Sequence, residues 1–137
     1  MHFSRVSRAL AACALLVSAS VVAACGIKTN PDFQRQANHT DVQTADGSSK
    51  RNYDLILPMM QRCYTNPAPQ FDEKSGIGEI SVSALAYAGI VLVLRIEPEG
   101  ANTKITTYSM YPLWRATHAA VSLWVRGDKQ TCPINLL

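Results

Sequence analysis

Few side chains in this 137-residue sequence combine the type and the spacing that catalysis requires. Among residues 52–137 the only histidine is His118, which a hydrolase could use as a general base. A base of that kind needs a nucleophile and an orienting carboxylate within reach. No carboxylate lies at helical spacing from His118, although Asp72, Glu79 or Asp128 could approach it in the fold. We therefore expect His118 to be a solvated surface histidine.

Two further groups resemble chemical sites only superficially. Glu97 and Glu99 could form an acid/base pair, but they flank Pro98 and predict a solvated turn. Gly76 and Gly78 lack the following helix that would direct backbone N–H groups at a phosphate. The sequence contains no C-x-x-C and no clustered histidines, so it predicts no metal site. Together these patterns predict a protein that is not an enzyme.

The N-terminus has the layout of a secretory signal. Arg5 and Arg8 form a short charged region, an apolar run follows, and small residues come just before Cys25. The apolar run from Ala9 to Ala24 covers 16 residues, which is short of the roughly 20 that a membrane-spanning helix needs. We therefore expect a cleaved signal peptide rather than a membrane span.

The cleavage site resembles the lipobox of bacterial lipoprotein precursors, which places a branched apolar residue and small residues before a cysteine. The matching residues are Val22, Ala23, Ala24 and Cys25. The resemblance implies cleavage between Ala24 and Cys25, a diacylglycerol on the Cys25 sulfur and an N-acyl chain such as palmitate. It implies no other cofactor. Ordinary cleavage near Ala19 or Ser20, with Cys25 left as a free thiol, is the alternative.

By the same resemblance, Gly26 after the cysteine implies the outer membrane, because an aspartate there is the familiar signal for inner-membrane retention. The expected location is therefore the cell envelope of a Gram-negative bacterium, with the protein anchored by lipid and facing the periplasm. Several acyl chains give stable anchoring where one chain is marginal.

The remaining cysteines predict a disulfide. Cys13 leaves with the signal and Cys25 carries lipid, so Cys63 and Cys132 are left as a pair in an exported protein. Their bridge would close a loop of roughly 70 residues, which the loop-entropy model values at about 4 kcal/mol.

Composition limits the size and the partners of the mature protein. Removing residues 1–24 from the 137-residue chain leaves 113 residues, enough for one small domain. Without Arg5 and Arg8 the net charge falls from +3 to +1, and the cations are scattered. The sequence therefore predicts a membrane-anchored protein that does not bind nucleic acid.

The mature chain divides into a tether and a domain. Residues 25–51 combine the lipidated cysteine with a polar segment that Pro31 and Gly47 interrupt. A flexible coil of this length has a root-mean-square reach of roughly 28 Å. Residues 52–137 form the globular domain.

Periodicity predicts two helices and three strands in that domain. Helices are expected over 53–64 and 113–126, a connection over 65–76, and strands over 79–85, 90–96 and 103–110. The predicted fold class is α+β, a small three-stranded antiparallel sheet flanked by an N-terminal and a C-terminal helix (αβββα). Because Pro58 disfavours a helix interior, the first helix either begins near Leu57 or is kinked. In the last helix, the predicted exposed side carries Arg115, His118, Ser122 and Arg126.

Several short motifs resemble a group of small uncharacterised lipoproteins of proteobacteria. The first of these motifs are the lipobox and the polar segment. They are followed by a helix ending in Gln-Arg-Cys-Tyr, by two tryptophans, and by Gly-Asp before Cys-Pro. The matching residues here are Gln61, Arg62, Cys63, Tyr64, Trp114, Trp124, Gly127, Asp128, Cys132 and Pro133. The resemblance implies topology and location only, because the group offers no activity that could be transferred to this chain.

Binding is the function that these expectations favour. We expect a non-catalytic interaction module that docks on another envelope protein, with aromatic contacts near strand ends from Tyr87, Tyr108 and Tyr111. The alternative is a periplasmic carrier whose helices and sheet enclose a small hydrophobic or lipid ligand. A contiguous exposed aromatic patch favours the module, and an internal void favours the carrier.

Overall fold

The computed structural model describes residues 29–133, so the predicted signal peptide, the lipobox and Cys25 lie outside the described residues. In chain order the elements are α1 (Asn30–Gln36), β1 (His39–Asp46), α2 (Ser49–Cys63), β2 (Ala68–Asp72), β3 (Ile77–Ala84), the 3₁₀ turn η1 (Leu85–Tyr87), β4 (Gly89–Glu99), β5 (Asn102–Ser109), the 3₁₀ turn η2 (Pro112–Arg115) and α3 (Ala116–Trp124). Among residues 29–133, no helix is long and apolar enough to cross a membrane.

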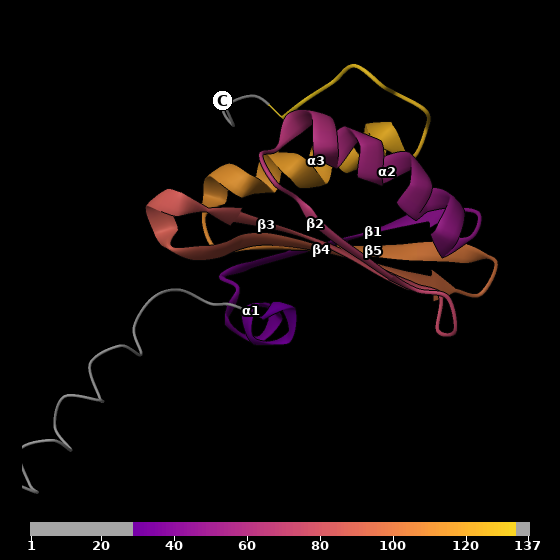
Figure 1. The fold of residues 1–137 in the computed structure, drawn as a ribbon. Coiled ribbons are helices and arrows are strands. Elements are labelled where there is room, and N and C mark those ends of the chain that lie inside the picture. Colours follow the sequence, from indigo (N-terminus) through magenta and orange to yellow (C-terminus); the bar gives the residue numbers. More distant parts are fainter. Residues whose placement is uncertain (1–28, 134–137) are drawn as a thin grey trace, which may run out of the picture.

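The strands form one five-stranded antiparallel sheet in the order β1-β5-β4-β3-β2. The predicted three-stranded αβββα fold is therefore wrong. The three predicted strands correspond to β3, β4 and β5, which occupy the centre of the sheet. Two further strands, β1 and β2, form its edges, and a third helix, α1, is added (Figure 1).

Helices α2 and α3 cover one face of the sheet and enclose the main core (Figure 1). This core combines buried residues of both helices with inward side chains of β3, β4 and β5, and its largest fully buried member is Trp124. Helix α2 runs through Pro58, which is exposed, and begins nine residues before it at Ser49. Ser48 caps this start, because its hydroxyl accepts a hydrogen bond from the Arg51 backbone N–H at 3.2 Å.

The predicted disulfide is confirmed. Cys63, the last residue of α2, is bonded to Cys132, with 5.5 Å between the two Cα atoms. The bridge ties the end of α2 to the segment that follows α3. It therefore holds the two covering helices together independently of their side-chain packing.

The flexible tether predicted over residues 26–51 is wrong for its described part. Helix α1 lies on the sheet face opposite α2 and α3, where Phe33 and Val93 are both fully buried. Strand β1 follows and pairs with β5 along its whole length. A polar segment becomes ordered here because its polar groups find partners, as the Asp41 carboxylate does on Arg115.

The predicted connection over 65–76 contains the edge strand β2. It pairs with β3 from Ala68 to Asp72, and Pro69 lies within it. Proline cannot donate a ladder hydrogen bond, but an edge strand needs donors on one side only.

The last helix differs from the prediction in its first turn and in its orientation. Residues 112–115 form η2, and the α-helix begins only at Ala116. Because a 3₁₀ turn advances about 120° per residue rather than 100°, the turn changes the angular phase of the helix. Leu113 in the turn is consequently exposed. In the helix itself, His118 is half-buried and not on the solvent side, whereas Leu123 is exposed.

Candidate functional site

The turn between β3 and β4 presents apolar side chains to solvent. It is formed by η1, and Leu85 at its start is fully exposed. Ala88 closes the turn in the left-handed region at φ +51°, donating its N–H to the Leu85 carbonyl at 3.1 Å. An exposed leucine at a turn is not explained by packing within residues 29–133.

Tyr87 and Tyr111 meet beside this leucine. Their ring centroids are 4.5 Å apart at an interplanar angle of 32°, and the side chains keep 46% and 37% exposure. Leu113, two residues beyond Tyr111, is 43% exposed. We call Leu85, Tyr87, Tyr111 and Leu113 the apolar end of the domain.

Tyr108 was grouped with these tyrosines in the sequence-based prediction, and the structure places it elsewhere. It lies inside β5, directly between Val93 of β4 and Thr40 of β1 in the register, and it is half-buried. Two of the three predicted tyrosines are therefore brought together, and Tyr108 is not part of the apolar end.

An open apolar groove adjoins the apolar end. Its volume is about 710 Å³, and its walls come from the end of α2, the β3–β4 turn and η2. Trp114 and Tyr64 form one wall, with ring centroids 6.1 Å apart, and Leu85 lies on its other side. The Tyr64 hydroxyl is hydrogen-bonded to the Thr117 hydroxyl, and burial raises the Tyr64 pKa so that the phenol stays neutral. Trp114 is 8% exposed, and its indole N–H has no acceptor within residues 29–133.

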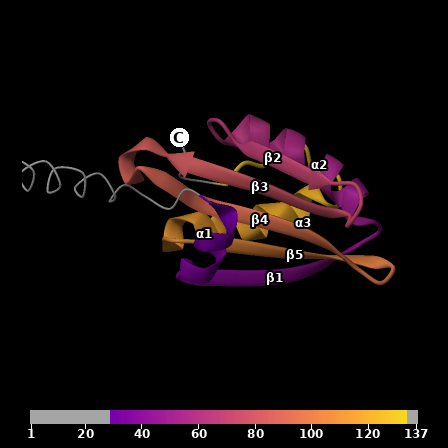
Figure 2. The same ribbon diagram turned by 60° about the horizontal axis from the view of Figure 1, so that its bottom comes forward.

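The first described residues lie at this same end of the sheet. Thr29, Asn30 and Pro31 line a hollow of about 480 Å³ together with Ser83 and Ile90, the pair that borders the β3–β4 turn. On the other side, Asn38 donates from Nδ2 to the Met110 carbonyl at 2.9 Å, next to Tyr111. Figure 2 shows α1 crossing the half of the sheet that carries the β3–β4 turn.

Glu79 fixes α1 against the sheet. Asn30 and Gln34 of α1 each donate a side-chain amide hydrogen bond to its carboxylate at 2.9 Å, and Arg95 of β4 forms an ion pair with it. Burial raises the pKa of the Glu79 carboxyl, but the hydrogen bonds and the Arg95 charge together lower it further than burial raises it. The carboxylate thus stays ionised and holds the start of the described chain.

Charge is absent from the sequence around the apolar end. Residues 81–94, which contain the β3–β4 turn, and residues 105–114, which contain Tyr111, include no Asp, Glu, Lys or Arg. The sheet's other end is charged, because Glu97, Glu99 and Lys104 surround the β4–β5 turn. The domain is therefore polarised along its strands.

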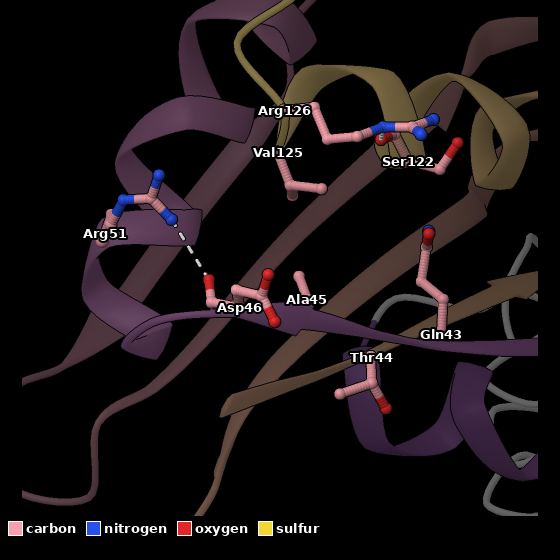
Figure 3. Close-up of a pocket in the computed structure, with 8 residues that line it drawn as sticks. All are labelled: Gln43, Thr44, Ala45, Asp46, Arg51, Ser122, Val125 and Arg126. Carbon is pink, nitrogen blue, oxygen red and sulfur yellow. Dashed lines mark hydrogen bonds between the residues drawn. The ribbon is translucent and has the colours of Figure 1, made fainter. Parts of the chain in front are cut away.

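A polar hollow of about 480 Å³ lies toward the charged end (Figure 3). Its lining comes from β1, the start of α2 and the end of α3: Gln43, Thr44, Ala45, Asp46, Arg51, Ser122, Val125 and Arg126. Arg51 donates from Nη1 to the Asp46 carbonyl at 3.1 Å, and Arg126 donates from Nε to the Ser122 carbonyl at 2.7 Å. Both guanidinium groups are oriented by backbone carbonyls, with Asp46 close to Arg51, so the hollow carries charges of both signs.

The residues that first suggested catalysis each have polar partners in the structure. His118 Nδ1 lies 3.2 Å from the Thr107 hydroxyl, and burial lowers the His118 pKa despite the opposing charge of Asp41. Asp41 itself is paired through both oxygens with Arg115, at 3.0 and 2.7 Å. Glu97 forms ion pairs with Arg95 and Lys104, and Glu99 accepts a hydrogen bond from Thr44.

Methionines and metal ligands add no further site within the described chain. Met59 and Met60 are buried in the core. Across residues 29–133, no three His, Cys, Asp or Glu side chains gather as metal ligands would.

A scan against protein-family models and searches of curated proteins and of solved structures found no match for this chain.

Proposed function

We propose that this chain is a lipid-anchored protein of the bacterial cell envelope that acts by surface contact and not by catalysis. Cys25 carries the lipid, residues 1–24 are the cleaved signal, and the domain is an interaction module on the periplasmic side of the outer membrane. The apolar end is its primary contact surface with the envelope. A protein partner in the envelope is part of this proposal.

The observation that supports contact through the apolar end is the exposed Tyr87–Tyr111 pair beside a fully exposed Leu85. Soluble monomeric domains rarely leave contiguous apolar side chains in water, and such patches mark interaction sites. Tyrosines suit such sites because each presents a rigid apolar ring and a polar tip. The lipid anchor is supported by the motif at Val22, Ala23, Ala24 and Cys25.

The apolar groove favours a second candidate, a carrier of a small hydrophobic or lipid molecule. Its volume of about 710 Å³ lies within the roughly 300–1,000 Å³ typical of ligand pockets. The unpartnered indole N–H of Trp114 at its wall would suit a ligand with a hydrogen-bond acceptor. The groove is open on one side, whereas a lipid carrier normally encloses its cargo, so we rank this function second.

Intact mass spectrometry of the full-length gene product, extracted from its own membranes in mild detergent, tests the anchor. The proposal expects the mass of residues 25–137 plus acyl groups, less two hydrogens for the disulfide. The matched variant Cys25→Ser should yield no acylated species. A wild-type chain that starts near residue 20 without lipid would contradict the proposal. A non-covalent lipid-like mass that survives removal of the acylated N-terminus, and that is lost in Trp114→Ala, would instead favour the carrier.

A further inference from the structure

We propose that the lipid bilayer itself covers Leu85, Tyr87, Tyr111 and Leu113, so that the domain lies directly on the membrane. This inference rests on the proposed lipid anchor at Cys25. It replaces the long tether expected from the sequence with a short link and a fixed orientation.

The length of chain between the anchor and the domain supports this orientation. Thr29 is the N-cap of α1, and it lies four residues after Cys25. Four residues span at most about 14 Å even when fully extended. Because Thr29 shares a hollow with Ser83 and Ile90, the anchor must enter the membrane close to the β3–β4 turn.

The helix at this junction is held in place, so the link cannot lengthen without cost. Releasing α1 would expose the fully buried Phe33 and break the hydrogen bonds from Asn30 and Gln34 to Glu79. The Phe33 backbone N–H also bonds to the Thr29 carbonyl at 3.0 Å, which ties the start of the described chain to the helix. The anchored end and the apolar end are therefore the same end of the domain.

The chemistry of that end suits the bilayer interface. The two segments that form it, 81–94 and 105–114, contain no Asp, Glu, Lys or Arg, so contact of these segments with headgroups and acyl chains would desolvate none of their side chains as a charge. Leu85 and Leu113 can enter the apolar boundary, while tyrosines are favoured at headgroup level.

A membrane covering the apolar end leaves the charged end for a protein partner. Ten residue steps along β4 place the β4–β5 turn about 34 Å from the β3–β4 turn. The polar hollow is on that side, since Asp46 pairs with Asn102 in the register beside the β4–β5 turn. A partner bound there would contact Arg51 and Arg126 without displacing the domain from the membrane.

Site-specific photo-crosslinking of the full-length protein in its own membranes tests the inference. A benzophenone amino acid replaces Leu85 or Tyr87, and Ala101 in the β4–β5 turn is the matched control because it is also exposed. We expect phospholipid adducts, identified by mass, from positions 85 and 87 and none from position 101. A second variant, Leu85→Glu, should reduce the lipid adduct at position 87 several-fold while the protein stays membrane-bound.

The possible outcomes separate the two proposals. If the chain carries lipid on Cys25 but positions 85 and 87 yield a protein adduct or no adduct, the membrane-contact inference fails and the anchor stands. Equal lipid adducts at positions 85 and 101 would also overturn the inference, because they indicate a domain without fixed orientation. If the chain carries no lipid, the proposed function fails.

Discussion

The rings of Tyr87, in the turn before β4, and Tyr111, after β5, lie 4.5 Å apart and remain exposed. The contact joins two chain segments that meet only because β4 and β5 are paired along their length. When buried, an aromatic pair of this kind contributes about 0.5–1.5 kcal/mol to the free energy of unfolding, and at a surface it contributes less. Its placement is therefore better explained by contact with something outside residues 29–133 than by stability.

Substitutions at the apolar end should affect function far more than stability. We expect Leu85→Ser and Tyr87→Ser to change the free energy of unfolding by less than about 1 kcal/mol, because neither side chain is buried. Trp124→Ala, which empties a fully buried site, should cost about 3–5 kcal/mol. Urea denaturation of the three variants measures these changes in the free energy of unfolding. A loss at position 85 as large as that at position 124 would show that the leucine is structural.

Reducing the disulfide should destabilise the domain strongly. The bridge between Cys63 and Cys132 closes a sequence separation of 69 residues. On the loop-entropy model its removal costs about 4 kcal/mol, a large share of the roughly 5–15 kcal/mol that stabilises a typical domain. We expect the double variant Cys63→Ala/Cys132→Ala to lose this amount in chemical denaturation. Reduced wild-type protein is the control, and it should match the variant; an unchanged midpoint in either would contradict the prediction.

Acid should release α1 before it unfolds the sheet. The pKa of Glu79 is lower in the folded chain than in the unfolded chain, where it is about 4.3. Its stabilising contribution is therefore complete above that value and is lost as the pH falls through the folded pKa. The hydrogen-exchange protection factors of the Phe33 and Gln34 backbone amides should fall across this range. In Glu79→Gln the exchange should be faster at neutral pH and lose this pH dependence; identical profiles for both proteins would refute the role of Glu79.

A second pH dependence should come from His118. Burial against the sheet lowers its folded pKa below the unfolded value of about 6.5. The unfolded state then binds a proton more readily, so stability is lost as the pH falls from about 6.5 through the folded pKa. The expected decline should be absent in His118→Gln, and His39→Gln is the matched control that should retain it. A titration by NMR in which the His118 pKa is not lowered would contradict this account.

The centre of the sheet could be predicted from local sequence, and its edges could not. Residues 90–96 form an almost continuous run of apolar and β-branched residues, broken only by Arg95, and this run indicates the central strand β4. Strand β1 carries the opposite of the usual pattern: Asp41 and Gln43 face the helices, and Val42 faces solvent. This inversion is stable because Asp41 pairs with Arg115 and Gln43 donates to the His118 carbonyl, partners that only the tertiary fold provides.

Helix α1 did leave a local signal. Thr29 is an N-cap, Pro31 lies in the first turn, and Asp32 is the acidic residue of that turn. Pro31 interrupts the sequence periodicity, but proline is favoured where a helix begins. The Tyr87–Tyr111 contact had no comparable signal, because it depends on the register of β4 with β5.

The orientation of the domain on the membrane can be measured, and it shows whether the apolar end lies on the bilayer. Energy transfer can be measured in vesicles that contain an acceptor-labelled lipid and the lipidated full-length protein. The donor is a fluorescent amino acid at position 87 or at position 101, two exposed sites at opposite ends of β4. We predict clearly stronger transfer from position 87, since the apolar end lies on the bilayer. Equal transfer from both positions would mean that the domain tumbles on a flexible tether, and it would contradict the account.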